Sequence, residues 1–326
     1  MRKYLLSTSA LAGAALLSSA AIADVSISGT FEWAYEARDS NITANDGSVM
    51  KQESDVDINF TNKTDSGLTI TAVNDFDTDA DVNDDVYMSI AGGFGTLKMG
   101  ETDGANATFE MNALGLVQEE EGGTLSSTTT NTATISTSTS GSGGNNQQIT
   151  YLLPAMGGLT AGVSVGTGTV AKNNEYTAVG LKYAMTAGDA AITLAYSTKT
   201  TETTTTADND GSSYGINIAQ GALSFTLSAG TKTGVDEDIS SQSAGVSYDM
   251  GNGLVVAAAT VKAEDDDDAG EEYDMTTYEA AYTIASGLSA VLNVSDFDYE
   301  NGTNVDAAAQ VDVNGTTTSL TIKATF

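Results

Sequence analysis

Alternation of apolar and polar residues runs through most of the chain, in stretches of about 8 to 12 residues bounded by Gly, Asp, Asn and Ser. The last stretch is the clearest, because its apolar residues occupy every second position: Leu320, Ile322, Ala324 and Phe326. Successive side chains of a β-strand point to opposite faces, so each stretch predicts a strand with one apolar and one polar face. The chain is therefore expected to be all-β.

The first 23 residues are predicted to form a cleaved signal peptide. Arg2 and Lys3 give a positive start, an apolar stretch follows, and Ala21-Ile22-Ala23 matches the small-x-small cleavage signal. An uncleaved transmembrane helix is the alternative, but Ser and Thr interrupt this run, which is short for a span of about 20 apolar residues. No later stretch approaches a spanning helix, so residues 24–326 can meet a membrane only as a barrel or at its surface.

Acidic residues outnumber basic residues by 44 to 12, and histidine and cysteine are absent. The signal segment holds two basic residues and no acid, which leaves 10 against 44, a net charge of −34. Nucleic acid is excluded as a natural partner, because phosphate binding needs clustered Lys and Arg. Lack of histidine excludes Ser-His-Asp hydrolysis. The sequence contains no ordered carboxylate pair and no phosphate-binding glycine motif. Nothing in it therefore indicates an enzyme or a required cofactor.

The alternating stretches can be counted as sixteen strands, from residues 24–37 to residues 317–326, with one near 53–62. Tight turns that contain Gly or Asp alternate with longer polar connections, as they do in an up-and-down barrel. An even number of strands lets the first strand pair with the last and leaves no open edge. The predicted fold is a 16-stranded antiparallel transmembrane β-barrel.

A soluble β-sandwich or a β-solenoid adhesin is the alternative, because alternation alone marks only a half-buried strand. Aromatic residues near the strand ends favour the membrane, since they would form two interfacial girdles. They are Trp33, Tyr35, Tyr196 and Tyr214 at the outer side and Tyr183, Tyr248, Tyr282 and Phe326 at the inner side. The other face is expected to be almost entirely small or polar, so that it lines water.

The mature sequence resembles the Gram-negative porins, in particular the alphaproteobacterial type. The resemblance rests on the start Asp24-Val-Ser-Ile-Ser-Gly-Thr-Phe31, on the hairpin Gly92-Gly-Phe-Gly-Thr-Leu-Lys-Met-Gly100, and on the end Ser319-Leu-Thr-Ile-Lys-Ala-Thr-Phe326. It implies a homotrimer in contact with outer-membrane lipid, and a terminal Phe326 that acts as the membrane insertion signal. It also implies that the third external loop, residues 102–146, folds inward and narrows the pore.

The resemblance implies that acids of this loop face a cluster of arginines on the wall. The loop supplies acidic candidates, namely Asp103, Glu110, Glu119, Glu120 and Glu121. The arginine cluster has no counterpart, because only Arg38 follows the signal segment. Alternation turns Glu32, Asp55 and Asp57 toward the lumen, and the candidate lumen-facing bases are Lys98, Lys182 and Lys323.

Two acidic runs are candidate Ca²⁺ sites, because Ca²⁺ takes six to eight oxygen ligands from flexible loops. The first contains Asp75, Asp77, Asp79, Asp81 and Asp85, and the second contains Asp265, Asp266, Asp267 and Asp268. Neither run matches the EF-hand pattern. Loops that are simply kept solvated by their charge are the alternative.

The function predicted from these features is that of an outer-membrane general diffusion porin. It would pass small hydrophilic solutes and ions passively, with a preference for cations that follows from the acidic charge. A substrate-specific channel of the same architecture and a non-conducting adhesin or structural barrel are the alternatives. The first would carry a lumen ladder for one ligand, and the second would have a plugged lumen.

Overall fold

The computed structural model describes residues 24–41, 46–77, 85–118, 146–167, 174–203, 209–234, 237–267, 271–300 and 312–326. The strands in chain order are β1 (Asp24–Ser40), β2 (Gly47–Lys63), β3 (Thr69–Asp77), β4 (Val86–Gly92), β5 (Gly95–Thr102), β6 (Asn146–Leu152), β7 (Leu159–Thr167), β8 (Asn174–Ala187), β9 (Ala190–Thr203), β10 (Asn209–Gln220), β11 (Leu223–Gly234), β12 (Glu237–Gly251), β13 (Leu254–Asp265), β14 (Glu271–Ala285), β15 (Leu288–Glu300) and β16 (Val313–Thr325). The predicted signal peptide lies outside the described residues.

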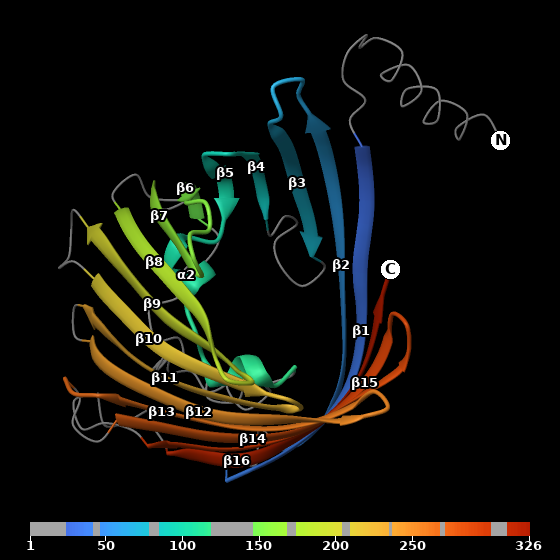
Figure 1. The fold of residues 1–326 in the computed structure, drawn as a ribbon. Coiled ribbons are helices and arrows are strands. Elements are labelled where there is room, and N and C mark those ends of the chain that lie inside the picture. Colours follow the sequence, from blue (N-terminus) through green and yellow to red (C-terminus); the bar gives the residue numbers. More distant parts are fainter. Residues whose placement is uncertain are drawn as a thin grey trace, which may run out of the picture.

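The sixteen strands form one closed barrel, which confirms the predicted fold. Each strand pairs antiparallel with its neighbours in sequence, and β1 pairs with β16 from Thr30 and Thr325 to Ser40 and Gly315. Two short helices follow β5, namely α2 (Ala105–Phe109) and the 3₁₀ helix η2 (Ala113–Leu116). Both lie inside the ring of strands (Figure 1). No helix among the described residues is long and apolar enough to cross a bilayer.

The two faces of the strands differ as alternation predicts. On β1, Phe31, Trp33 and Tyr35 lie on the outward face and are exposed, whereas Ala34 and Glu36, on either side of Tyr35, are buried on the inward face. All eight aromatic residues predicted to form the girdles are exposed on the outward face: Trp33, Tyr35, Tyr183, Tyr196, Tyr214, Tyr248, Tyr282 and Phe326. The outer surface of the barrel therefore carries a large exposed apolar area.

Each tight turn contains a residue with positive φ, as short hairpins require. Gly188 and Gly221 serve the β8–β9 and β10–β11 turns, and Asn252 is the one positive-φ residue of the described chain that is not glycine. At the ends opposite these turns, the strands are longer than the sequence predicted. Thus β2 begins at Gly47 rather than near residue 53. Pairing with β1 continues along these residues, because backbone hydrogen bonds require no apolar face.

The prediction that the inward face is almost entirely small or polar is wrong at the external ends of β12–β16. Apolar side chains on the inward face there form a cluster with Leu114 of η2, and Val117 packs against it. The large members are Ile239, Val261, Tyr273, Met275, Phe297, Tyr299 and Val313. This sector faces the loop instead of water, so burial of apolar area stabilises it.

Phe326 closes the barrel beside Gly29, near the end at which β1 begins. The Phe326 amide donates to the Gly29 carbonyl at 2.9 Å, and the Gly29 amide donates back to the Phe326 carbonyl at 3.4 Å. Deletion of Phe326 removes this pair and an aromatic ring that is 82% exposed. We expect it to reduce the amount of assembled barrel without changing synthesis, as measured by the heat-modifiable band on gels and by immunoblotting. Phe326→Tyr keeps both features and is expected to assemble normally. Equal assembly of the deletion variant and the native chain would contradict this role.

Candidate functional site

The described first part of the long insert, residues 103–118, lies against the inward wall of the barrel. The Ala105 amide at the start of α2 donates to Ser164 Oγ at 2.7 Å. Lys182 Nζ donates to the Thr108 carbonyl at 3.1 Å, near the end of the helix. Ser164 and Lys182 are inward residues of β7 and β8, so the wall binds α2 at both ends.

The wall binds η2 in the same way on the neighbouring strands. The Ala113 amide donates to Ser243 Oγ on β12 at 2.9 Å. The Gln118 amide donates to Glu279 Oε2 on β14 at 2.8 Å, and Leu114 packs in the apolar cluster. Residues 103–118 therefore follow the wall across several strands. The rest of the predicted constriction loop, residues 119–145, lies outside the described residues.

Glycines on the inward wall provide room for this loop. A Cβ atom at Gly180 would lie 2.6 Å from Phe109 Cβ, and one at Gly162 would lie 3.0 Å from the ring of Phe109. A Cβ atom at Gly215 would lie 2.9 Å from Met111, further along the loop. The loop can approach the wall this closely only because these positions carry no side chain.

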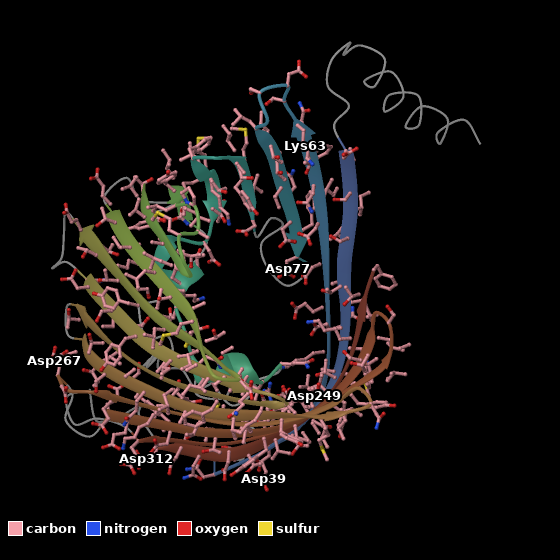
Figure 2. All side chains as sticks on the ribbon, in the orientation of Figure 1. Asp39, Lys63, Asp77, Asp249, Asp267 and Asp312 are labelled. Carbon is pink, nitrogen blue, oxygen red and sulfur yellow. The ribbon has the colours of Figure 1, made fainter. Side chains whose placement is uncertain are left out.

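Carboxylates gather on the inward faces of β2 and β3 and at the residue that precedes β4. They are Glu53, Asp55, Asp57, Asp75, Asp77 and Asp85, and we call them the acidic sector. Thr30 Oγ1 donates to Asp55 Oδ2 at 2.7 Å, and Ser28 Oγ donates to Asp57 Oδ2 at 3.4 Å. Figure 2 shows Asp77 beside the central opening of the ring, whereas Asp39, Asp267 and Asp312 lie along its rim. The register thus brings together acids that lie far apart in the sequence.

Lysines occupy the inward faces of other strands. Lys98 on β5 lies over the ring of Tyr87, 4.9 Å from its centre, and Lys199 on β9 lies 5.0 Å from the ring centre of Tyr176. Lys232 is an inward residue of β11. In a ring of sixteen strands, β9 and β11 lie across from β1 and β3. Charges of opposite sign therefore face each other across the lumen, with lysines in place of the arginines that the family resemblance implies.

Two inward acids of β1 are paired with bases. Glu32 forms an ion pair with Lys323 of β16. Glu36 is fully buried and forms ion pairs with Arg38 and with Lys51. Glu32 and Lys323 therefore both face inward as predicted, and each neutralises the charge of the other. Lys182 also faces inward, but its ammonium group binds the loop.

The acidic residues predicted for the constriction loop differ in their environments. Asp103 is exposed at the start of this loop, and Glu110 ends α2, with its amide donating to the Asn106 carbonyl at 2.8 Å. Glu119, Glu120 and Glu121 lie outside the described residues. Sequence reasoning did not find Glu53, Lys199 and Lys232 as inward charges. Alternation along their own strands was the signal that could have found them.

The residues of the two predicted Ca²⁺ sites lie only partly within the described chain. Asp75 and Asp77 belong to β3, and Asp79, Asp81 and Asp268 lie outside the described residues. In the described chain, the acids whose oxygen atoms lie within 4.8 Å of one another are Glu53, Asp55 and Asp77. Asp265 instead accepts the Asp238 and Asp267 amides and closes a turn, while Asp266 and Asp267 are exposed.

Known proteins match the chain in both sequence and fold. A family model described as "Gram-negative porin" matches residues 7–302. The anion-selective porin from Comamonas acidovorans has a TM-score of 0.66 at 15% identity, with 94% of this chain and 100% of that chain covered. OmpT, an outer membrane protein of Vibrio cholerae solved in a trimer form, has a TM-score of 0.66 at 13% identity, with 93% and 99% covered. A search of curated proteins gave no match. Identities this low show the fold alone.

The position of the loop depends on the absence of a side chain at Gly180. Gly180→Ala places a methyl group against Phe109 and the α2 backbone, so the loop must shift. We expect the free energy of unfolding to fall by about 1–3 kcal/mol, as for other overpacked sites, and the single-channel conductance to change. Gly115→Ala is the matched control, because a Cβ atom there meets nothing within 4 Å. Thermal unfolding and bilayer recording measure both effects, and equal behaviour of the two variants would refute the account.

Proposed function

Because the chain belongs to the Gram-negative porin family, we propose that it is a general diffusion porin of the outer membrane that passes small hydrophilic solutes and ions and prefers cations. The acidic sector is the observation that carries the preference. Six carboxylates lie on the inward side of β2–β4, where the inward bases are two lysines, Lys51, which is paired with Glu36, and Lys63. The net charge of this sector is therefore negative, and four further inward lysines lie on β5, β8, β9 and β11.

The carboxylates of the acidic sector differ from those on β1 in their partners. Asp55 and Asp57 accept hydrogen bonds from hydroxyl groups and take part in no ion pair with a described residue. Their charges thus remain available to attract cations and to repel anions.

We further propose that residues 102–146 form the constriction loop, with Asp103, Glu110, Glu119, Glu120 and Glu121 as its acids, and that residues 1–23 are the cleaved signal peptide. The anchoring of α2 and η2 supports the first part. A segment bound to the wall through Ser164, Lys182 and Ser243 narrows the space available to solutes on that side.

The shortest strands mark a wall that is suited to contact with other copies of the chain. Strands β3–β7 have 7 to 9 residues, and β4 and β6 have only 7. A membrane-spanning strand needs about 9–11 residues. Outward polar residues Asn74, Glu101 and Gln147 lie on this wall, and Gln147 Nε2 donates to Glu101 Oε2 at 3.3 Å. We propose that β3–β7 form the interface of a homotrimer, which shields them from lipid.

Removal of charge from the acidic sector should weaken the preference for cations. For Asp55→Asn with Asp57→Asn we expect the cation-to-anion permeability ratio to fall by about threefold, since surface potentials of a few kT act on each ion. Reversal potentials across a salt gradient measure this ratio. The effect should be strong near 0.01 M salt, where the Debye length is about 30 Å, and weak near 1 M, where it is about 3 Å. Acidification toward pH 4, the usual range of carboxylates, should reduce the preference of the native pore because it removes negative charge.

Asp296→Asn is the matched control, because Asp296 is an outward residue of β15. It is expected to leave the permeability ratio unchanged. Anion preference of the native pore at low salt and neutral pH would refute the charge argument, and a barrel that conducts no ions would refute the porin function.

A large residue on the wall of short strands should destabilise the trimer. Ile149 is exposed on the outward face of β6, and Ile149→Trp is expected to lower the temperature at which trimers dissociate on gels, because a packed interface has no room for the ring. Leu292→Trp on β15 is the control, since lipid accommodates the added ring. Equal dissociation temperatures for both variants would count against this interface.

A further inference from the structure

A groove of about 870 Å³ crosses the outward face of β9–β14. Its volume falls in the range of sites that bind small molecules. Register explains its shape. Ala229 and Ala244 form the floor, with the large Tyr214 and Leu227 on one side and Lys262 on the other. Tyr214, Ala229, Gln242, Lys262 and Asp274 lie on one line across five strands, so the small residues stand between larger ones.

The groove changes from apolar to charged along its length. Leu194, Ile216 and Leu227 line one end, and Lys262 and Asp274 line the other. Tyr214 belongs to the outer aromatic girdle and is 60% exposed, so it marks the level where hydrocarbon meets head groups. Lys262 and Asp274 lie nearer the external ends of their strands than Tyr214 does. The apolar end therefore lies at the depth of acyl chains and the charged end at the depth of head groups.

The charged end has a negative balance. Lys262 Nζ lies 3.0 Å from Glu264 Oε1 and 3.0 Å from Glu272 Oε2, and Asp274 lies beside it on the neighbouring strand. Three carboxylates thus surround one ammonium group, which is already paired. A ligand that brings only a phosphate would be repelled, whereas a ligand with its own ammonium group would complement Asp274.

We propose that this groove holds one lipid whose head group carries an ammonium group. An acyl chain lies over Ala244 and Ala229, beside Leu227, and the ammonium group binds at Asp274. The proposal depends on the location of the barrel in a membrane but not on the ion preference of the pore. The groove is separate from the wall of β3–β7, so it stays on the lipid side of the proposed trimer.

Native mass spectrometry of the purified full barrel, released from detergent with added phosphatidylethanolamine or phosphatidylglycerol, tests the proposal. The native chain is expected to retain one phosphatidylethanolamine more tightly than phosphatidylglycerol. Ala244→Trp fills the floor and should abolish this retention. Ala280→Trp is the matched control, because it adds the same ring on the outward face of β14 outside the groove, and it should retain the lipid.

Asp274→Asn removes the proposed ammonium contact and keeps the shape of the groove. We expect it to weaken phosphatidylethanolamine binding roughly tenfold, the scale of one lost hydrogen bond to a charged group, and to change phosphatidylglycerol binding little. Equal retention by Ala244→Trp and Ala280→Trp would overturn the site. Stronger retention of phosphatidylglycerol than of phosphatidylethanolamine by the native chain would overturn the charge argument and with it the proposed occupant. Conductance measured on the same preparations reports separately on the porin function.

Discussion

Backbone hydrogen bonding is the constraint on which the rest of this structure depends. A chain in a bilayer has no water to satisfy its amides and carbonyls, so strands can cross only if every one has two neighbours. The pairing of β1 with β16 meets this condition, and it holds from Thr30 to Ser40. The alternating sequence follows from it, because a closed sheet has one face toward lipid and the other toward its own interior. The turns, in which positive-φ residues recur, follow as well, since only tight hairpins keep neighbouring strands adjacent.

The inward side chains of the barrel differ between the sectors that face the lumen and the sector that packs against the loop. Charged side chains of β2–β4 and of β8–β11 lie where solutes are proposed to pass, and the apolar cluster at the external ends of β12–β16 lies where Leu114 and Val117 pack. The loop connects the two regions, because α2 lies against β6–β9 and η2 against β11–β13. Hydroxyl groups on the wall accept the Ala105 and Ala113 amides, so these two loop amides are hydrogen-bonded inside the barrel.

Sequence reasoning was strong where the physical signal is local and weak where it depends on register. Period-2 alternation sufficed for sixteen strands and for the outward aromatic residues, because both are properties of one strand at a time. The grouping of Asp77 with Glu53 and Asp55 was not predicted, since it arises from the pairing of β2 with β3. The apolar interior of β12–β16 was missed for a related reason. Alternation predicts that Val261 and Phe297 point inward, but it does not tell whether the loop or water lies next to them.

The apolar cluster has a consequence for how size relates to throughput in such barrels. The number of strands sets the diameter of the cylinder. In this protein, however, side chains such as Val261 and Met275 are almost fully buried, so water does not reach the wall on that side. The hydrated cross-section is therefore smaller than the cylinder and lies off its axis, toward the strands that carry the charges. Two barrels with the same strand count can then differ in conductance through the residues that fill one side of the bore, without any change in their outer dimensions.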